Sequence, residues 1–115
     1  MQYRVKALTM VNIKGGSTTC SVDPGVMVAM PGCRIKFVNL TSDEVHIQGS
    51  ARELFVKPVR GYRGVGGHGF KVRPRANVTL AVGRLKRGVY PYAVFCECTS
   101  KYCTGGSMPI IIVPR

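Results

Sequence analysis

The chain has 115 residues, a length that suits one domain with its own hydrophobic core, and we expect a single domain over residues 1–115. It carries 17 Lys and Arg against 5 Asp and Glu, a formal net charge of +12, which favours acidic proteins, anionic membrane surfaces and nucleic acids as partners. With 14 Gly and 7 Pro, the chain is interrupted too often for long helices.

Several short segments place apolar residues at every second position, which is the pattern of half-buried β-strands. In residues 34–39, for example, Ile35 and Phe37 share one face and two cations occupy the other. The strands that we expect, in chain order, are residues 3–11, 22–30, 34–39, 45–47, 78–82, 89–98 and 110–113. About seven or eight short strands joined by turns predict an all-β fold, a sandwich or a small barrel.

Two segments do not fit this pattern. Residues 50–56 could form a short helix, but the stretch is too brief to decide. Residues 57–69, KPVRGYRGVGGHG, combine glycines with cations and are predicted to form a flexible basic loop.

The basic residues concentrate in the middle of the chain, where only Glu53 opposes ten of them between Arg52 and Arg87. Such a cluster can dock an acidic surface, and it can equally be a solvated surface that keeps a protein in solution. The residues that we select as partner-binding candidates are Lys57, Arg60, Arg63, Lys71, Arg73 and Arg75.

The last fifth of the chain holds three of the five cysteines within eight residues, in FCECTSKYC. If residues 89–98 form a strand, Cys96 and Cys98 share a face with Tyr92, while Glu97 lies on the other face. Because Glu97 should prefer water, both thiols are predicted to point inward. Inward thiols at a strand end are placed either to pack or to bind a metal.

The order of landmarks along the chain resembles the cupredoxin family. They are PGCRIKFVN (31–39), EVHIQG (44–49), VRPRANVTLAV (72–82), RGVYPY (87–92) and GSMPIIIV (106–113). The final segment is similar in particular to the copper domain of cytochrome c oxidase subunit II. The resemblance implies a Greek-key β-sandwich that holds copper at one end. It also implies one histidine ligand after an early strand and the other ligands in the loop between the last two strands.

The ligand loop departs from the family pattern, because it contains no histidine. Cys98, Cys103 and Met108 follow one another with four residues in each gap, so a cysteine stands where a histidine is expected. By the resemblance, the metal ligands would be His46, Cys96, Cys98, Cys103 and Met108, with His68 as a weaker candidate. Thiolates with few imidazoles form a soft donor set that favours Cu(I), or Zn(II), over Cu(II).

The cysteines also have structural interpretations. Cys103 could form a disulfide with Cys96 or Cys98 and close a short loop, and single buried cysteines commonly serve as small packing residues. Cys20 and Cys33 lie outside the loop and are interpreted as structural or paired with each other. Because the number of cysteines is odd, at least one of them has no disulfide partner within the chain.

The sequence therefore leaves two main candidate functions. The first is a copper-binding protein that handles Cu(I) or transfers electrons. The second is a metal-free module of the same fold that docks an acidic partner, a membrane surface or a larger complex through the basic loop. Nucleic-acid binding rests on charge alone, with Phe55, Tyr62 and Phe70 as stacking candidates.

Neither an enzyme nor a membrane-spanning chain is expected. The five acids are scattered apart from Asp43-Glu44, so no paired-carboxylate site is indicated, although a Cys–His nucleophile pair stays open. No signal peptide and no apolar stretch of membrane-spanning length is visible. A leader or anchor removed upstream would leave the same sequence, so the compartment stays open.

Overall fold

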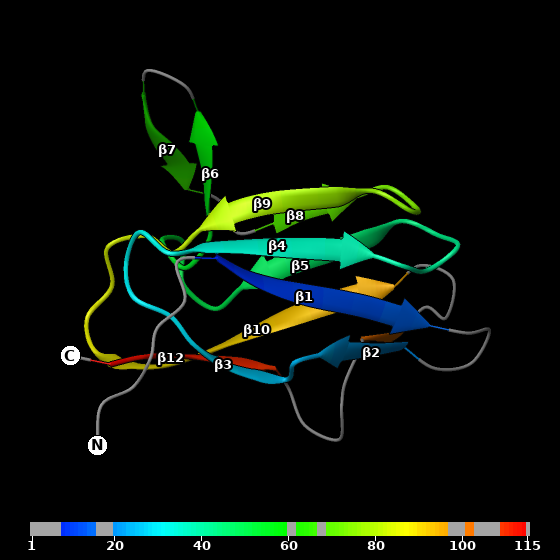
Figure 1. The fold of residues 1–115 in the computed structure, drawn as a ribbon, viewed down its shortest axis with the longest axis horizontal. Coiled ribbons are helices and arrows are strands. Elements are labelled where there is room, and N and C mark those ends of the chain that lie inside the picture. Colours follow the sequence, from blue (N-terminus) through cyan, green and yellow to red (C-terminus); the bar gives the residue numbers. More distant parts are fainter. Residues whose placement is uncertain are drawn as a thin grey trace.

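The computed structural model describes residues 8–15, 20–59, 62–66, 69–96, 101–102 and 109–114, with the backbone alone at residues 57–59, 62–66 and 101–102. These residues form two β-sheets that face each other (Figure 1). The strands are β1 (Leu8–Gly15), β2 (Cys20–Asp23), β3 (Val26–Val28), β4 (Arg34–Asn39), β5 (Val45–Gly49), β6 (Val56–Val59), β7 (Tyr62–Gly66), β8 (Gly69–Val72), β9 (Asn77–Ala81), β10 (Gly88–Cys96), β11 (Lys101–Tyr102) and β12 (Ile110–Val113).

The first sheet has the strand order β2-β1-β4-β9-β6-β7, and the second has the order β3-β12-β10-β5-β8, with β11 paired to β10. The chain passes between the sheets several times, so neighbouring strands are distant in sequence, as in the parallel pairs β1–β4 and β3–β12. The predicted all-β sandwich is confirmed. The described residues form twelve strands rather than seven or eight, because short strands such as β2 and β3 were merged in the prediction.

The prediction of a loop over residues 57–69 is wrong in part. Strands β6 and β7 form an antiparallel hairpin, with Val56 opposite Gly66 and Val59 opposite Tyr62. In Figure 1 this hairpin projects beyond the other strands, and β6 joins the first sheet only through Val56 and Ala81. Glycines and a proline in the hairpin produced turn signals that masked its strands.

Residues 51–54 form turns rather than a helix, with the Leu54 amide donating to the Ala51 carbonyl at 3.1 Å. The part of the chain that the structure describes holds no helix of the length and hydropathy that a bilayer crossing requires.

The core lies between the two sheets, where the alternating apolar residues point inward as predicted. Ile35, Phe37 and Leu80 are fully buried. Phe37 and Phe55 form a T-shaped triad with Tyr92, with ring centroids 5.3 to 5.8 Å apart. Edge-to-face contacts of this kind add to the stability that burial of aromatic rings provides.

The hydroxyl group of Tyr92 is buried and has no hydrogen-bond partner among the described residues. Burial raises the pKa of Tyr92, because the phenolate would lose its hydration inside the core. Below about pH 10 the folded and unfolded states both hold this proton. Above that pH the unfolded state releases it and the folded state keeps it, so stability falls as the pH rises.

We therefore expect Tyr92→Phe to flatten the alkaline loss of stability. Between pH 8 and 11 the wild-type protein should lose about 1.4 kcal/mol more than the variant, from the ionisation of this one group in the unfolded state. Urea unfolding of both proteins from pH 8 to 11 measures this difference. Tyr90→Phe, which removes a hydroxyl that donates to the Lys86 carbonyl at 2.6 Å, is the matched control. Parallel curves for wild type and Tyr92→Phe would contradict the account.

Candidate metal centre

The candidate metal ligands were predicted at one end of the sandwich, and the strand register shows which of them meet there. Strand β5 begins and β10 ends at this end, and the two are antiparallel neighbours. His46 lies opposite Phe95, and Val45 lies opposite Cys96. Directly opposed residues of an antiparallel pair project from the same face of the sheet. The register therefore assigns His46 and Cys96 to different faces.

His46 is on the outer face of the second sheet. Its Nε2 atom lies 3.5 Å from Glu44 Oε1, and both side chains are 32 % exposed. The imidazole also contacts the Phe95 ring edge-to-face, with centroids 6.3 Å apart. A carboxylate beside one ring nitrogen commonly fixes the orientation of a metal-binding histidine. The pairing of His46 with Glu44 was not predicted. Residues two positions apart along a strand lie on the same side, so the sequence pattern could have suggested it.

Cys96 is on the inner face and is fully buried, as Val45 and Val94 are. The prediction that this thiol points inward is confirmed. Since His46 projects outward from the neighbouring strand, the described structure does not bring these two candidate ligands together.

The other candidates, Cys98, Cys103, Met108 and the weaker His68, lie outside the described residues. Within the described part of the chain, no three His, Cys, Asp or Glu side chains are grouped so that they could hold a metal ion. The five-donor site thus stays a prediction, and only the positions of His46 and Cys96 are fixed.

The cysteines outside the loop differ from the predicted pair. Cys20, at the buried start of β2, is disulfide-bonded, whereas Cys33 carries a thiol. The predicted alternative in which these two residues form a disulfide with each other is therefore wrong. Cys33 precedes β4, which leads away from it toward the end where His46 and Cys96 lie (Figure 1).

A buried amide holds the turn that leads into β5. Asn39 Nδ2 donates to the carbonyls of Asp43 (2.8 Å), Val72 (3.0 Å) and Arg73 (3.0 Å). Its Oδ1 atom accepts from the Thr41 amide at 2.9 Å and from the Thr41 hydroxyl at 2.6 Å. Both side chains are buried. The network connects the end of β4 to the segment after β8, and so sets where β5 and His46 begin.

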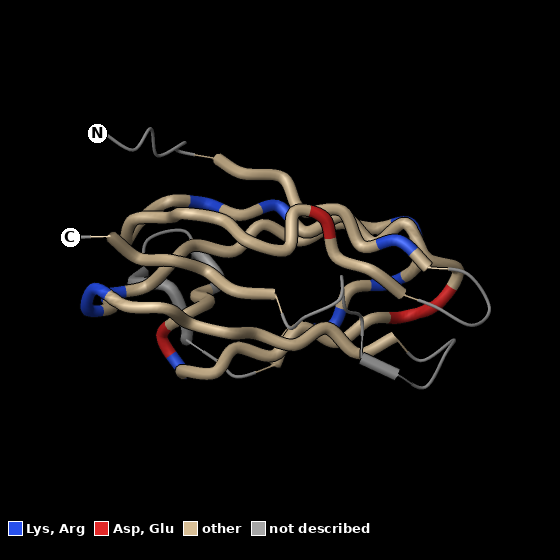
Figure 2. Tube along the Cα trace, turned by 90° about the horizontal axis from the view of Figure 1, so that it is seen from below, with Lys and Arg blue, Asp and Glu red and all other residues tan. Residues whose placement is uncertain are grey.

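The basic candidates are only partly described. Lys71 on β8 and Arg73 and Arg75 just after it are exposed, and Lys71 is the cross-strand neighbour of His46. The backbone at Lys57 lies in β6 and that at Arg63 in β7, while Arg60 is outside the described residues. Figure 2 shows that blue Lys and Arg positions outnumber red Asp and Glu positions along the described trace.

One of the proposed stacking rings is unavailable for nucleic acid. Phe55 is fully buried in the aromatic triad, and Phe70 is partly buried against the core. The side chain of Tyr62 is not among those described.

No family model and no curated protein matches the chain. Solved structures do resemble it. Reduced auracyanin from the photosynthetic bacterium Roseiflexus castenholzii aligns with a TM-score of 0.57 at 13% identity, over 97% of this chain and 100% of that one. A Cu(I) form of an amicyanin mutant aligns with a TM-score of 0.53 at 11% identity, over 96% of this chain and 85% of that one.

A larger protein contains a similar unit. The blue copper oxidase from Nitrosomonas europaea aligns with a TM-score of 0.53 at 12% identity, over 95% of this chain and 44% of that one. At such identities the likeness concerns the fold alone. The two-sheet architecture and these alignments together show that the chain has a cupredoxin-like β-sandwich fold.

Proposed function

We propose that this chain binds copper at the end of the sandwich where β5 begins and β10 ends. The observation that carries the proposal is the position of His46, at the start of β5 beside the strand from which the cysteine-rich segment continues. The Cu(I) form of an amicyanin mutant and the blue copper oxidase share the fold, and the description of each includes copper.

The proposed ligands are His46, Cys98, Cys103 and Met108 in reduced protein, in which the disulfide of Cys20 is broken. Cys96 was a fifth candidate, but it lies on the face opposite to His46 and is fully buried. We therefore assign Cys96 to the core, where a thiol packs as a small apolar group. Imidazole, thiolate and thioether donors form a soft set that suits Cu(I) better than a hard cation.

The soft donor set supports two uses of copper, which spectroscopy separates. A site that stays colourless and holds Cu(I) would serve copper handling. A site that gives an intense visible charge-transfer band on oxidation would serve electron transfer. Zinc is the competing ion, because thiolate and imidazole ligands bind it as well.

The ligand assignment predicts how cysteine variants behave. Reduced wild-type protein should bind one Cu(I) per chain, measured by competition with a chromogenic Cu(I) chelator. Cys98→Ser should lower the affinity at least a hundredfold, because it removes a thiolate ligand. Cys96→Ala should keep the affinity within a few-fold of wild type. Cys33→Ser is the matched control, since its thiol lies at the opposite end of β4.

Loss of Cu(I) binding in Cys96→Ala, with Cys98→Ser unaffected, would overturn the ligand assignment. Because Cys20 is disulfide-bonded, thiols should be counted before each titration so that the redox state is known. Absence of Cu(I) and Zn(II) binding by reduced, folded wild-type protein would overturn the function itself.

A second candidate is a metal-free docking module, which the exposed cations Lys71, Arg73 and Arg75 favour. Lys71 adjoins His46, so an acidic partner bound there would cover the candidate metal end. This function would be selected if the protein bound no metal but bound a partner with an affinity that falls steeply with salt. Arg75→Glu should then weaken the binding of the partner.

A further inference from the structure

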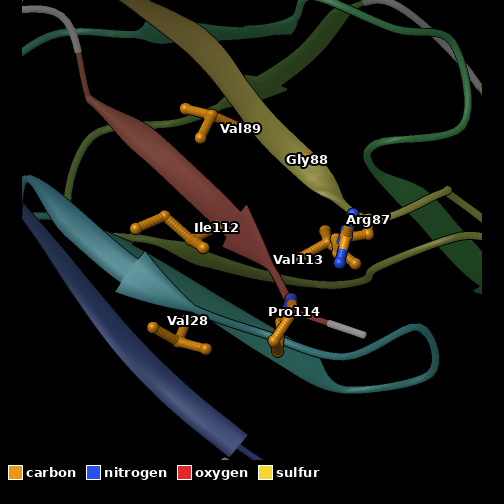
Figure 3. Close-up of a pocket in the computed structure, with 7 residues that line it drawn as sticks. All are labelled: Val28, Arg87, Gly88, Val89, Ile112, Val113 and Pro114. Carbon is orange, nitrogen blue, oxygen red and sulfur yellow. The ribbon is translucent and has the colours of Figure 1, made fainter.

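The outer face of the second sheet is apolar at the end away from the candidate metal centre. Its residues lie in two rows across three neighbouring strands, as the registers of β10, β12 and β3 define. We call the following six residues the apolar sheet face: Val28, Ile112 and Val89 in one row, and Val26, Ile110 and Pro91 in the other. Figure 3 shows the first row as side chains on three adjacent strands.

This face departs from the usual pattern of an antiparallel sheet, in which one side packs on the core and the other is polar. The alternate residues Met27, Ile111 and Val113 are buried in the core, so these strands are apolar on both sides. Val89 is 60% exposed and Val26 is 55% exposed. The other four residues of the face are partly exposed, and apolar residues grouped in this way on a surface are typical of interaction sites.

The first sheet provides an internal comparison. Its outer face carries Arg34, Lys36, Asn77 and Thr79 on β4 and β9, which line an open groove, and exposed Leu8 and Met10 on the neighbouring strand β1. That face mixes charged, polar and apolar groups, as a solvated surface commonly does. The apolar sheet face differs in that none of its six residues is charged or polar.

A groove in the apolar sheet face gives it a definite shape. It has a volume of about 340 Å³. The lining residues are Val28, Arg87, Gly88, Val89, Ile112, Val113 and Pro114. Arg87 is the only charged residue among them, and Figure 3 shows it to one side of the row, near Val113 and Pro114. The groove thus combines an apolar floor with one cation at its end.

The positive charge continues beyond the groove. Arg84, Lys86 and Arg87 are all exposed in the connection between β9 and β10. In Figure 2 blue segments mark this connection, at the end of the sandwich where the C-terminus also lies. A ligand that fills the groove would therefore gain from carrying negative charge next to its apolar part.

We propose that this groove docks an acidic protein segment, which inserts an apolar side chain between Val28, Ile112 and Val89 and places a carboxylate near Arg87. Charge complementarity selects this occupant over a second copy of the chain, because two molecules of formal charge +12 repel each other. The shape selects it over a membrane, because the apolar sheet face is grooved and offers no Trp or Tyr to insert among headgroups.

The docking site is separate from the proposed copper function. The groove lies at the first residues of β10, whereas the candidate metal centre lies at the end of β10, where Cys96 is the last residue of the strand. The two sites therefore occupy opposite ends of one strand. A partner held at the groove would anchor the domain and leave the His46 end accessible. Neither proposal depends on the other.

A random-peptide library displayed on phage tests this proposal, with selection on the wild-type protein and counter-selection on Val89→Glu. The selected peptides should share a bulky apolar residue and at least one Asp or Glu. In fluorescence anisotropy, Val89→Glu and Val26→Glu should each weaken binding about tenfold or more, since they place a charge in the apolar contact. Arg87→Glu should weaken it several-fold, with a smaller salt dependence.

Met10→Glu is the matched control, because Met10 is 51% exposed on β1 in the other sheet and should leave binding within twofold of wild type. Circular dichroism checks that each variant is folded. Because Val26 and Val89 are both substituted, the test still works if one of the two variants misfolds. Four results would each overturn the proposal. They are failure to enrich any peptide, enrichment of basic peptides, sedimentation as a dimer that Val89→Glu dissociates, and binding to phosphatidylglycerol vesicles that Val89→Glu abolishes.

Discussion

Asn39→Ala is expected to lower the free energy of unfolding by about 3–5 kcal/mol, because it removes several buried hydrogen bonds and leaves their partners unpaired. In the wild type the Asn39 amide donates to three backbone carbonyls, and its carbonyl oxygen accepts from both the amide and the hydroxyl of Thr41. Alanine can replace none of these interactions. Water cannot reach the vacated groups easily, since Asn39 and Thr41 are both buried.

Urea unfolding of Asn39→Ala and Asn77→Ala measures this effect against a matched control. Asn77 is an exposed residue of β9, and its replacement should change stability by less than about 0.5 kcal/mol. A loss below about 1 kcal/mol in Asn39→Ala would show that the turn before β5 is held by other contacts. His46 would then owe its position to the strand pairing of β5 rather than to this amide.

Gly83→Ala should destabilise the protein by about 2–4 kcal/mol through a steric clash. A Cβ atom at this position would overlap the backbone carbonyl oxygen of Glu53 and approach Val56 Cγ2 to 2.9 Å. The Gly83 amide also donates to that same carbonyl at 3.0 Å, so the two segments cannot separate without losing a hydrogen bond. The glycine is needed here for close approach of two backbones.

Gly69→Ala is the control for this substitution, because a Cβ atom there would meet no atom within 4 Å. It should leave the urea midpoint nearly unchanged, whereas Gly83→Ala should shift it clearly to lower urea. Equal midpoints in the two variants would show that the turn at residues 51–54 moves aside at little cost, contrary to the packing described.

The sequence could predict the faces of individual strands. Alternation in residues 34–39 correctly placed Ile35 and Phe37 in the core, and alternation along β10 correctly turned Cys96 inward. Both predictions rest on a period of two within one segment, which a single chain reveals directly. The same periodicity failed at the β6–β7 hairpin, where glycines and a proline interrupted it.

The sequence could not predict how strands from distant parts of the chain pair with one another. His46 and Cys96 are fifty positions apart, and only the register of β5 against β10 shows that they face opposite sides. A shift by one residue would have placed them on the same side. The same limit applies to Cys20, whose disulfide could not be assigned from spacing, and to Asn39, whose partners Val72 and Arg73 lie far along the chain.

The apolar sheet face shows a related limit. Within residues 22–30, alternation puts Val26 and Val28 on one side of a strand, and apolar residues on a strand are ordinarily assigned to the core. Here the core is built from Met27 and its neighbours, and the alternating valines face outward beside β12. Strands that are apolar on both faces give no signal for which face is buried, so this surface emerges only from the packed sheets.

The most direct test of the copper proposal is a Cu(I) titration of reduced protein that was purified without added metal, followed by an optical spectrum after oxidation. The account predicts one tightly bound Cu(I) per chain in wild type and its loss in Cys98→Ser. Folded, fully reduced protein that leaves all Cu(I) with the competing chelator would contradict the account. The cupredoxin-like fold would then act as a scaffold, and the grooved apolar sheet face would be the place to look for function.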